Sequence, residues 1–168
     1  MVNSNLLVTF DPVHEKSAKI EITVVLEKLK KKAKILKIEE GLVELSADNP
    51  REVVKALKNV DKEKFKYTFY WWPVDGWCKS NIENIKTSIK KIQKGIKQEE
   101  KWKMDLSKRK VTQKYPKDLI IKLTEVIDKP KVDLENPDKI IKVEIVSDRA
   151  AVSLLTPDEI FSVPKLKS

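Results

Sequence analysis

The stretch ILKIEEGLVELSADNPREVVKAL, residues 35–57, decides the fold of the first half of this chain. Residues 35–39 and 42–46 are two short strand-forming segments, and the Glu-Gly pair at 40–41 between them is typical of a β-hairpin. Residues 49–52 read Asn-Pro-Arg-Glu, in which Asn is a good N-cap and Glu is placed to reach back to it. The stretch therefore predicts two strands followed at once by a capped helix.

The flanking segments extend this pattern on both sides. Residues 6–10 form a short apolar run typical of a strand, and residues 67–72 predict another, apolar on both faces. Between the first strand and the hairpin, apolar residues recur at helical spacing: Ala18, Ile22, Val25, Leu29 and Ala33. The order β-α-β-β-α-β over residues 5–73 is the ferredoxin-like plan, so we predict a ferredoxin-like domain at residues 1–75.

The second half of the chain predicts a separate α/β unit at residues 79–168, after a linker at 74–79. Isoleucines at helical spacing run from Ile82 to Ile96, and an alternating strand follows at residues 101–107. Pro116 fits the first turn of another helix, whose expected buried face is Leu119, Ile120, Leu123, Val126 and Ile127. Residues 140–146 and 150–155 predict a closing hairpin, and residues 156–168 a docking or frayed tail. The fold class is therefore α+β.

Positive charge is concentrated in one quarter of the chain. Residues 79–122 hold 14 Lys and Arg against 5 Asp and Glu, a balance of +9, whereas the two flanking parts together sum to zero. Such a concentration is the electrostatic footprint expected for a polyanion partner. A solvated lysine-rich surface is the structural alternative for the helical part of this region.

The candidate phosphate contacts fall on a helix and on a loop. On the isoleucine helix, lysines recur on one flank of the apolar face. The loop at residues 108–117 precedes a predicted helix start, where backbone N–H groups also favour anions. Within it, Arg109 can fork onto a phosphate. The predicted RNA-binding residues are Lys86, Lys90, Lys94, Lys103, Lys108, Arg109, Lys110, Lys114 and Lys117.

Several segments of the second half together resemble the THUMP domain. They are residues 102–105 (WKMD) running into Lys108-Arg109, residues 131–139 (KVDLENPDK), residues 143–145 (VEI) and residues 151–155 (AVSLL). The resemblance implies an α-α-β-α-β-β arrangement, which commonly follows a ferredoxin-like unit. It also implies tRNA binding near the acceptor stem and the 3′ end.

The resemblance is strongest to stand-alone THUMP proteins that assist an acetyltransferase in making N4-acetylcytidine in tRNA. Many other THUMP proteins carry a methyltransferase, thiouridine-forming or deaminase domain, and none follows here before Ser168. We therefore expect a tRNA-binding adaptor with no catalytic activity of its own, whose partners are tRNA and a tRNA-modifying acetyltransferase.

Few residues suggest chemistry. With glycine only at 41, 76 and 95, neither a P-loop nor a dinucleotide fingerprint can form, so we expect no cofactor. The acidic residues of segment 133–138 allow a hard-cation site, although the resemblance explains them as turn-forming. Two alternatives therefore stay open: a small metal-dependent RNA-processing enzyme using Asp133, Glu135 and Asp138, and a protein-interaction module without RNA binding.

The remaining expectations concern one tryptophan and the location of the protein. Trp77, in the predicted linker, can stack on an unpaired base or pack between the two units. The lone Cys78 excludes an internal disulfide and fits a reducing compartment. Since no signal peptide opens the chain and no apolar run reaches bilayer length, we expect a cytoplasmic protein with no membrane partner.

Overall fold

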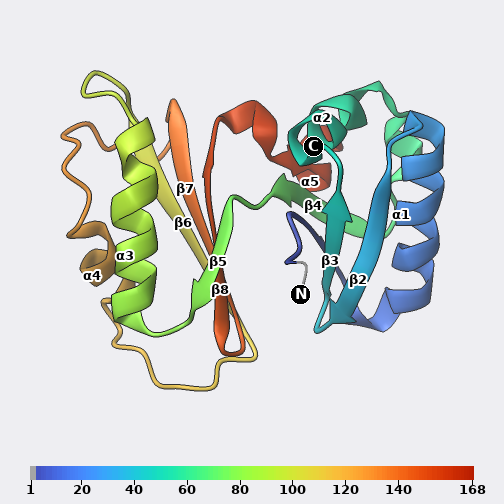
Figure 1. Ribbon diagram of the computed structural model, residues 1–168. Helices are drawn as coiled ribbons and strands as arrows, with labels where there is room; N and C mark the ends of the chain where they lie inside the picture. The colour runs from blue at the N-terminus through green and yellow to red at the C-terminus, as the bar shows by residue number, and fades with distance from the viewer. Residues whose placement is uncertain (1–2) are drawn as a thin grey trace. The chain divides into compact units, whose positions relative to one another are not determined.

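The computed structural model describes residues 3–168 and contains two compact units (Figure 1). The first runs to Val74 and also takes in Asp158–Ser168, and the second is Asp75–Pro157. The sequence assigned residues 158–168 to the second unit, and here the structure divides the chain differently. The reason is a strand pairing: Phe161 and Ser162 lie beside Trp71 and Tyr70 of the first sheet.

The first unit is a five-stranded antiparallel sheet with helices on one face (Figure 1). Its strands lie in the order β2-β3-β1-β4-β9, and the first four have the predicted β-α-β-β-α-β connectivity of a ferredoxin-like unit. The sequence missed the fifth strand because it is only two residues long. The elements are β1 (Leu6–Phe10), α1 (Glu15–Leu29), β2 (Ala33–Glu39), β3 (Leu42–Ala47), α2 (Pro50–Ala56), β4 (Thr68–Pro73), β9 (Phe161–Ser162) and α5 (Val163–Leu166).

The predicted Asn49 cap and the turn form, whereas the Glu52 carboxylate, expected to reach back to Asn49, lies 3.7 Å from Lys31. Asn49 Oδ1 accepts a hydrogen bond from the Glu52 backbone N–H at 3.3 Å, which starts α2. Gly41 joins β2 to β3 with a φ of 77°, a left-handed conformation that favours glycine. A side chain at this position has no room either, because a Cβ would lie 2.7 Å from the Phe10 carbonyl oxygen.

A buried carboxylate ties α1 to the start of β4. Glu21 accepts hydrogen bonds from the backbone N–H groups of Lys66, Tyr67 and Thr68, at 2.7, 3.0 and 2.9 Å, and from the Thr68 hydroxyl at 2.7 Å. Thr68 Oγ1 in turn accepts a hydrogen bond from Trp71 Nε1 at 3.1 Å. The helix stripe of the sequence gives no sign of this role, because Glu21 stands between apolar positions as an ordinary polar residue.

The second unit is a four-stranded sheet in the order β5-β8-β7-β6, in which only the β6–β7 pair is parallel. Helices α3 and α4 cover one face of this sheet (Figure 1). The core between them contains Ile85, Ile89, Trp102, Met104, Leu119 and Leu123. The elements are β5 (Gly76–Lys79), α3 (Ile82–Ile92), β6 (Trp102–Arg109), α4 (Leu119–Thr124), β7 (Lys139–Val146) and β8 (Arg149–Leu155).

Two local predictions in this unit were wrong, the linker at residues 76–79 and the burial of Ile120. Residues 76–79, predicted as a linker, are strand β5, since Gly76 to Lys79 pair with Val152 to Arg149 of β8. Trp77 therefore lies in a sheet, with the Arg149 guanidinium 4.3 Å from the centre of its ring. Ile120, predicted to be buried, is 41% exposed, whereas the other residues of the predicted face, Leu119, Leu123, Val126 and Ile127, pack into the core.

Candidate nucleic-acid interface

The basic segment 108–117 runs from the end of β6 towards α4 and is attached to two other parts of the second unit. Thr112 Oγ1 donates a hydrogen bond to the Ser147 carbonyl in the β7–β8 turn, at 3.4 Å. Gln113 Nε2 donates to Ser80 Oγ, just before α3, at 3.2 Å. The segment is therefore held at the end of the sheet where β6 finishes and α3 begins.

The strand register brings more cations to this end of the sheet. Lys79 of β5 lies opposite Arg149 of β8, Arg149 lies opposite Val146 of β7, and Val146 lies beside Arg109 of β6. Three cations from distant parts of the sequence thus occupy one row across the sheet. Together with the basic segment they form the cationic end: Lys79, Lys108, Arg109, Lys110, Lys114, Lys117 and Arg149.

Arg149 was missed by the sequence analysis. It lies in the C-terminal part, residues 123–168, where 7 Lys and Arg face 9 Asp and Glu, so that no local excess of positive charge marks it. Only the pairing of β8 with β5 and β7 brings it into the cationic row. The sequence does contain a weak signal, because Arg149 ends the predicted hairpin turn at 147–149, and turns lie at the protein surface.

Arg109 has a structural partner. Its Nε lies 3.4 Å from Oε2 of Glu144, whose side chain is only 2% exposed. Burial raises the pKa of Glu144, while the charges of Arg109 and Lys142 act in the opposite direction. Burial also lowers the pKa of Lys142. The phosphate contact of Arg109 stays a prediction, and its Nε has a second role in compensating a buried carboxylate.

This pair makes the stability of the protein pH-dependent. A carboxyl group whose pKa is higher in the folded state stabilises the fold below its unfolded pKa and loses that contribution as pH rises through the folded value. We expect wild type to lose stability relative to Glu144→Gln as the pH rises from 4 to 7, as measured by urea unfolding at a series of pH values. A constant difference between the two proteins would contradict this assignment.

The predicted lysines outside the basic segment lie on α3, in the turn after it and on β6. Lys86, on α3, lies 3.5 Å from Glu125, and Lys90 is exposed on the same helix. Lys94 lies in the 3-10 turn beyond Ile92, because α3 ends earlier than the isoleucine pattern predicts. Lys103 points to the face of the sheet opposite α3 and lies 3.8 Å from Asp105.

The N-terminus of the helix after the basic segment contributes less to anion binding than the sequence predicts. Lys114 and Lys117 are exposed. However, α4 is only six residues long and Asp118 makes no side-chain cap hydrogen bond. The dipole of so short a helix is small, so the lysine side chains remain the source of positive charge here.

Two of the three acidic residues of segment 133–138, Asp133 and Asp138, accept hydrogen bonds within the fold. Asp133 Oδ1 accepts hydrogen bonds from the backbone N–H groups of Glu135 and Asn136, at 3.0 and 2.9 Å, and these bonds lower the pKa of Asp133. Asp138 Oδ2 accepts one from the Lys101 N–H at 2.8 Å. Across residues 3–168, no three His, Cys, Asp or Glu side chains are grouped as metal ligands.

Residues 79–155 match the family described as the THUMP domain. The chain contains a THUMP domain. The match begins at Lys79, the last residue of β5, and ends at Leu155, the last residue of β8, so it spans the whole cationic end. The two helices that the resemblance implied at its start are α3 and a short 3-10 turn.

Solved structures of low sequence identity share the fold of both units. PH1313 from Pyrococcus horikoshii OT3 is 17% identical with a TM-score of 0.68, and the match covers 95% of this chain and 55% of that one. TrmN from Thermus thermophilus is 13% identical with a TM-score of 0.54, covering 89% and 44%. A 4-thiouridine synthetase in complex with RNA and ATP is 14% identical with a TM-score of 0.52, covering 96% and 42%.

The matches cover nearly all of this chain but only part of each matched protein. This chain spans about half the length of the proteins to which its THUMP domain and ferredoxin-like unit are similar. No curated protein sequence matches it. Among residues 3–168, no helix has both the length and the apolar character needed to cross a bilayer.

Proposed function

We propose that this chain is a non-catalytic adaptor that binds tRNA through the cationic end of its THUMP domain and presents the acceptor stem and 3′ end to a modifying enzyme. The observation that carries the proposal is the gathering of Lys79, Arg149 and the lysines of segment 108–117 at one end of one sheet. Lysine side chains bind phosphates and contact the RNA backbone, so this surface recognises the shape of a tRNA helix and not its base sequence.

The comparisons support the class of ligand. One of the matched structures is a synthetase of a modified uridine bound to RNA, and its similarity to this chain covers both units. The partner is the finer part of the proposal, and it rests on the resemblance of segments 102–105 and 131–139 to THUMP proteins that assist tRNA acetylation. We infer that the partner is a tRNA cytidine N4-acetyltransferase.

Nucleoside analysis tests the partner. In cells that lack this chain, we expect tRNA to lose N4-acetylcytidine while other modified nucleosides stay at wild-type levels, as measured by mass spectrometry of digested tRNA. Returning the wild-type gene should restore the modification, and a version with the lysines of segment 108–117 changed to glutamate should not. Unchanged acetylcytidine together with loss of a different nucleoside would assign the adaptor to another enzyme.

A further inference from the structure

The densest lysine run of the chain lies outside the THUMP domain. Segment 28–37, KLKKKAKILK, holds six lysines in ten residues and no acidic residue. It covers the end of α1, the turn after it and most of β2, which is the edge strand of the first sheet. The proposed function does not use these residues. The net charge of residues 1–78 gives no sign of them, because 12 acidic residues elsewhere in that part nearly cancel its positive charge.

Two of the six lysines are paired within the fold and four are not. Lys31 lies 3.7 Å from Glu52, and Lys37 lies 3.0 Å from Glu39. The other four ammonium groups are exposed, and no carboxylate of residues 3–168 lies within ion-pair distance of them: Lys28, Lys30, Lys32 and Lys34.

Part of this charge has a structural explanation. Lys28 and Lys30 lie at the C-terminal end of α1, where cations interact favourably with the helix dipole. Lysines on an edge strand also discourage pairing with other chains. Neither effect explains why Lys32 and Lys34 both line one hollow on the surface of the first unit.

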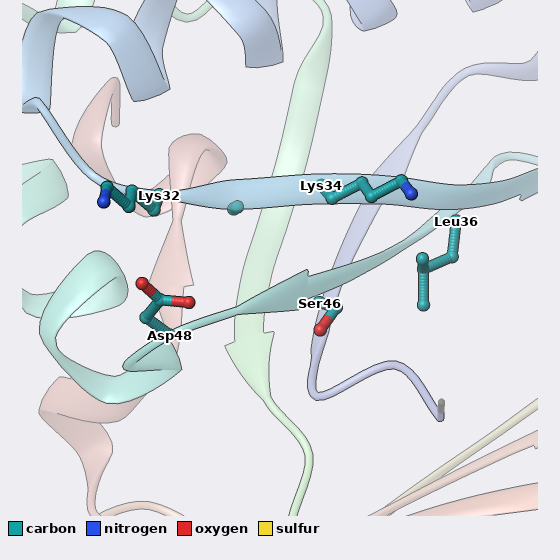
Figure 2. Close-up of a pocket in the computed structure, with 6 residues that line it drawn as sticks. Lys32, Lys34, Leu36, Ser46 and Asp48 are labelled. Carbon is teal, nitrogen blue, oxygen red and sulfur yellow. The ribbon is translucent and has the colours of Figure 1, made fainter. Parts of the chain in front are cut away.

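That hollow has a volume of about 380 Å³ and lies over β2 and β3 (Figure 2). Lys32 and Asp48 border one end, Lys34 and Ser46 the middle, and Leu36 the other end (Figure 2). The side chains of Ser46 and Asp48 have no hydrogen-bond partner among residues 3–168. The hollow thus offers two ammonium groups and two oxygen acceptors on one small surface.

We propose that this hollow binds the ribose-phosphate backbone of RNA. The ammonium groups of Lys32 and Lys34 bind successive phosphates. In an extended chain, residues i and i+2 are about 6.6 Å apart, and the flexible lysine side chains can adjust to the distance between two phosphates. The Asp48 carboxylate accepts a hydrogen bond from a ribose 2′-hydroxyl, and the Ser46 hydroxyl donates one to the oxygen of a ribose 2′-hydroxyl, the group that distinguishes RNA from DNA. This inference rests on the proposed function and adds a second contact region to it.

Affinity measurements test the lysines. For Lys32→Glu with Lys34→Glu, we expect tRNA affinity in about 0.1 M salt to fall roughly tenfold, and the slope of log affinity against log salt to decrease by about 2. The matched control is Lys16→Glu with Lys19→Glu, two exposed lysines of α1 that change the net charge equally. An equal loss in both variants, or none in either, would overturn the inference.

A second measurement tests the Ser46 and Asp48 side chains. For Asp48→Ala with Ser46→Ala, we expect the preference for a single-stranded RNA over the DNA of the same sequence to fall severalfold, while the salt dependence stays unchanged. An unaltered preference for RNA would show that Ser46 and Asp48 do not contact the 2′-hydroxyl. If the Lys32 and Lys34 variant binds tRNA as wild type does, while charge reversal in the basic segment abolishes binding, this inference is wrong and the proposed function stands. If wild type binds no RNA, both proposals fail.

Discussion

Changing Lys108, Lys110 and Lys114 to glutamate should lower the affinity for tRNA by roughly 100-fold or more at about 0.15 M salt. Each phosphate contact releases a counterion when it forms, so three lost contacts remove a large share of a charge-driven affinity. The three reversed charges also repel neighbouring phosphates. The affinity is measured by a mobility shift or by fluorescence anisotropy with a labelled tRNA, over a series of salt concentrations.

This triple variant leaves Arg109 unchanged for a structural reason. The triplet Lys108-Arg109-Lys110 invites reversal as a block, but a glutamate at 109 would face the buried Glu144. Breaking a buried ion pair costs about 3–5 kcal/mol, and loss of binding in such a variant would then report unfolding. The lysines chosen are exposed, so we expect their replacement to leave the melting temperature within a few degrees of wild type.

The matched control changes Lys16, Lys19 and Lys58, three exposed lysines of the first unit, to glutamate. Both triple variants lower the net charge from +9 to +3, since each replacement changes the charge by two. If affinity depended on net charge alone, the two would bind equally weakly. Full tRNA binding by the Lys108, Lys110 and Lys114 variant would show that the cationic end is not the binding site.

The second large effect concerns stability. Glu21→Ala should destabilise the protein by about 3–5 kcal/mol, because it leaves three backbone N–H groups and the Thr68 hydroxyl without their acceptor. An unsatisfied buried donor costs about 1–3 kcal/mol, and a domain is stable by only about 5–15 kcal/mol. The loss is measured as a shift in the urea unfolding midpoint.

Two further variants make this prediction specific. Glu27→Ala removes an exposed carboxylate from the same helix and should change stability by less than about 0.5 kcal/mol. Glu21→Gln keeps one oxygen acceptor but turns an amide N–H₂ towards backbone donors, so we expect an intermediate loss. A Glu21→Ala protein as stable as Glu27→Ala would mean that water replaces the carboxylate.

Much of the fold follows from local sequence. The Glu40-Gly41 turn and the Asn49 cap fix the middle of the first unit, because each depends on groups within a few residues. The isoleucines of α3 and the alternation of β6 likewise predicted their elements, since apolar spacing records which face is buried. The two-residue β9 and the four-residue β5 escaped prediction because they contain too few residues to show a period.

The chain of amino acids by itself determined where the positive charge is concentrated, but only the tertiary structure decided which cations act together. Side-chain charge is a property of each residue, and it can be counted along the sequence. Proximity depends on strand register and on position along each strand: Arg149 lies beside Lys79, Arg109 lies against Glu144 at the end of β6, and Lys103 lies near the start of β6. Pairing between strands far apart in the chain produces no recognisable pattern in the local sequence of either strand. The arrangement of cations on the binding surface is therefore known only from the tertiary structure.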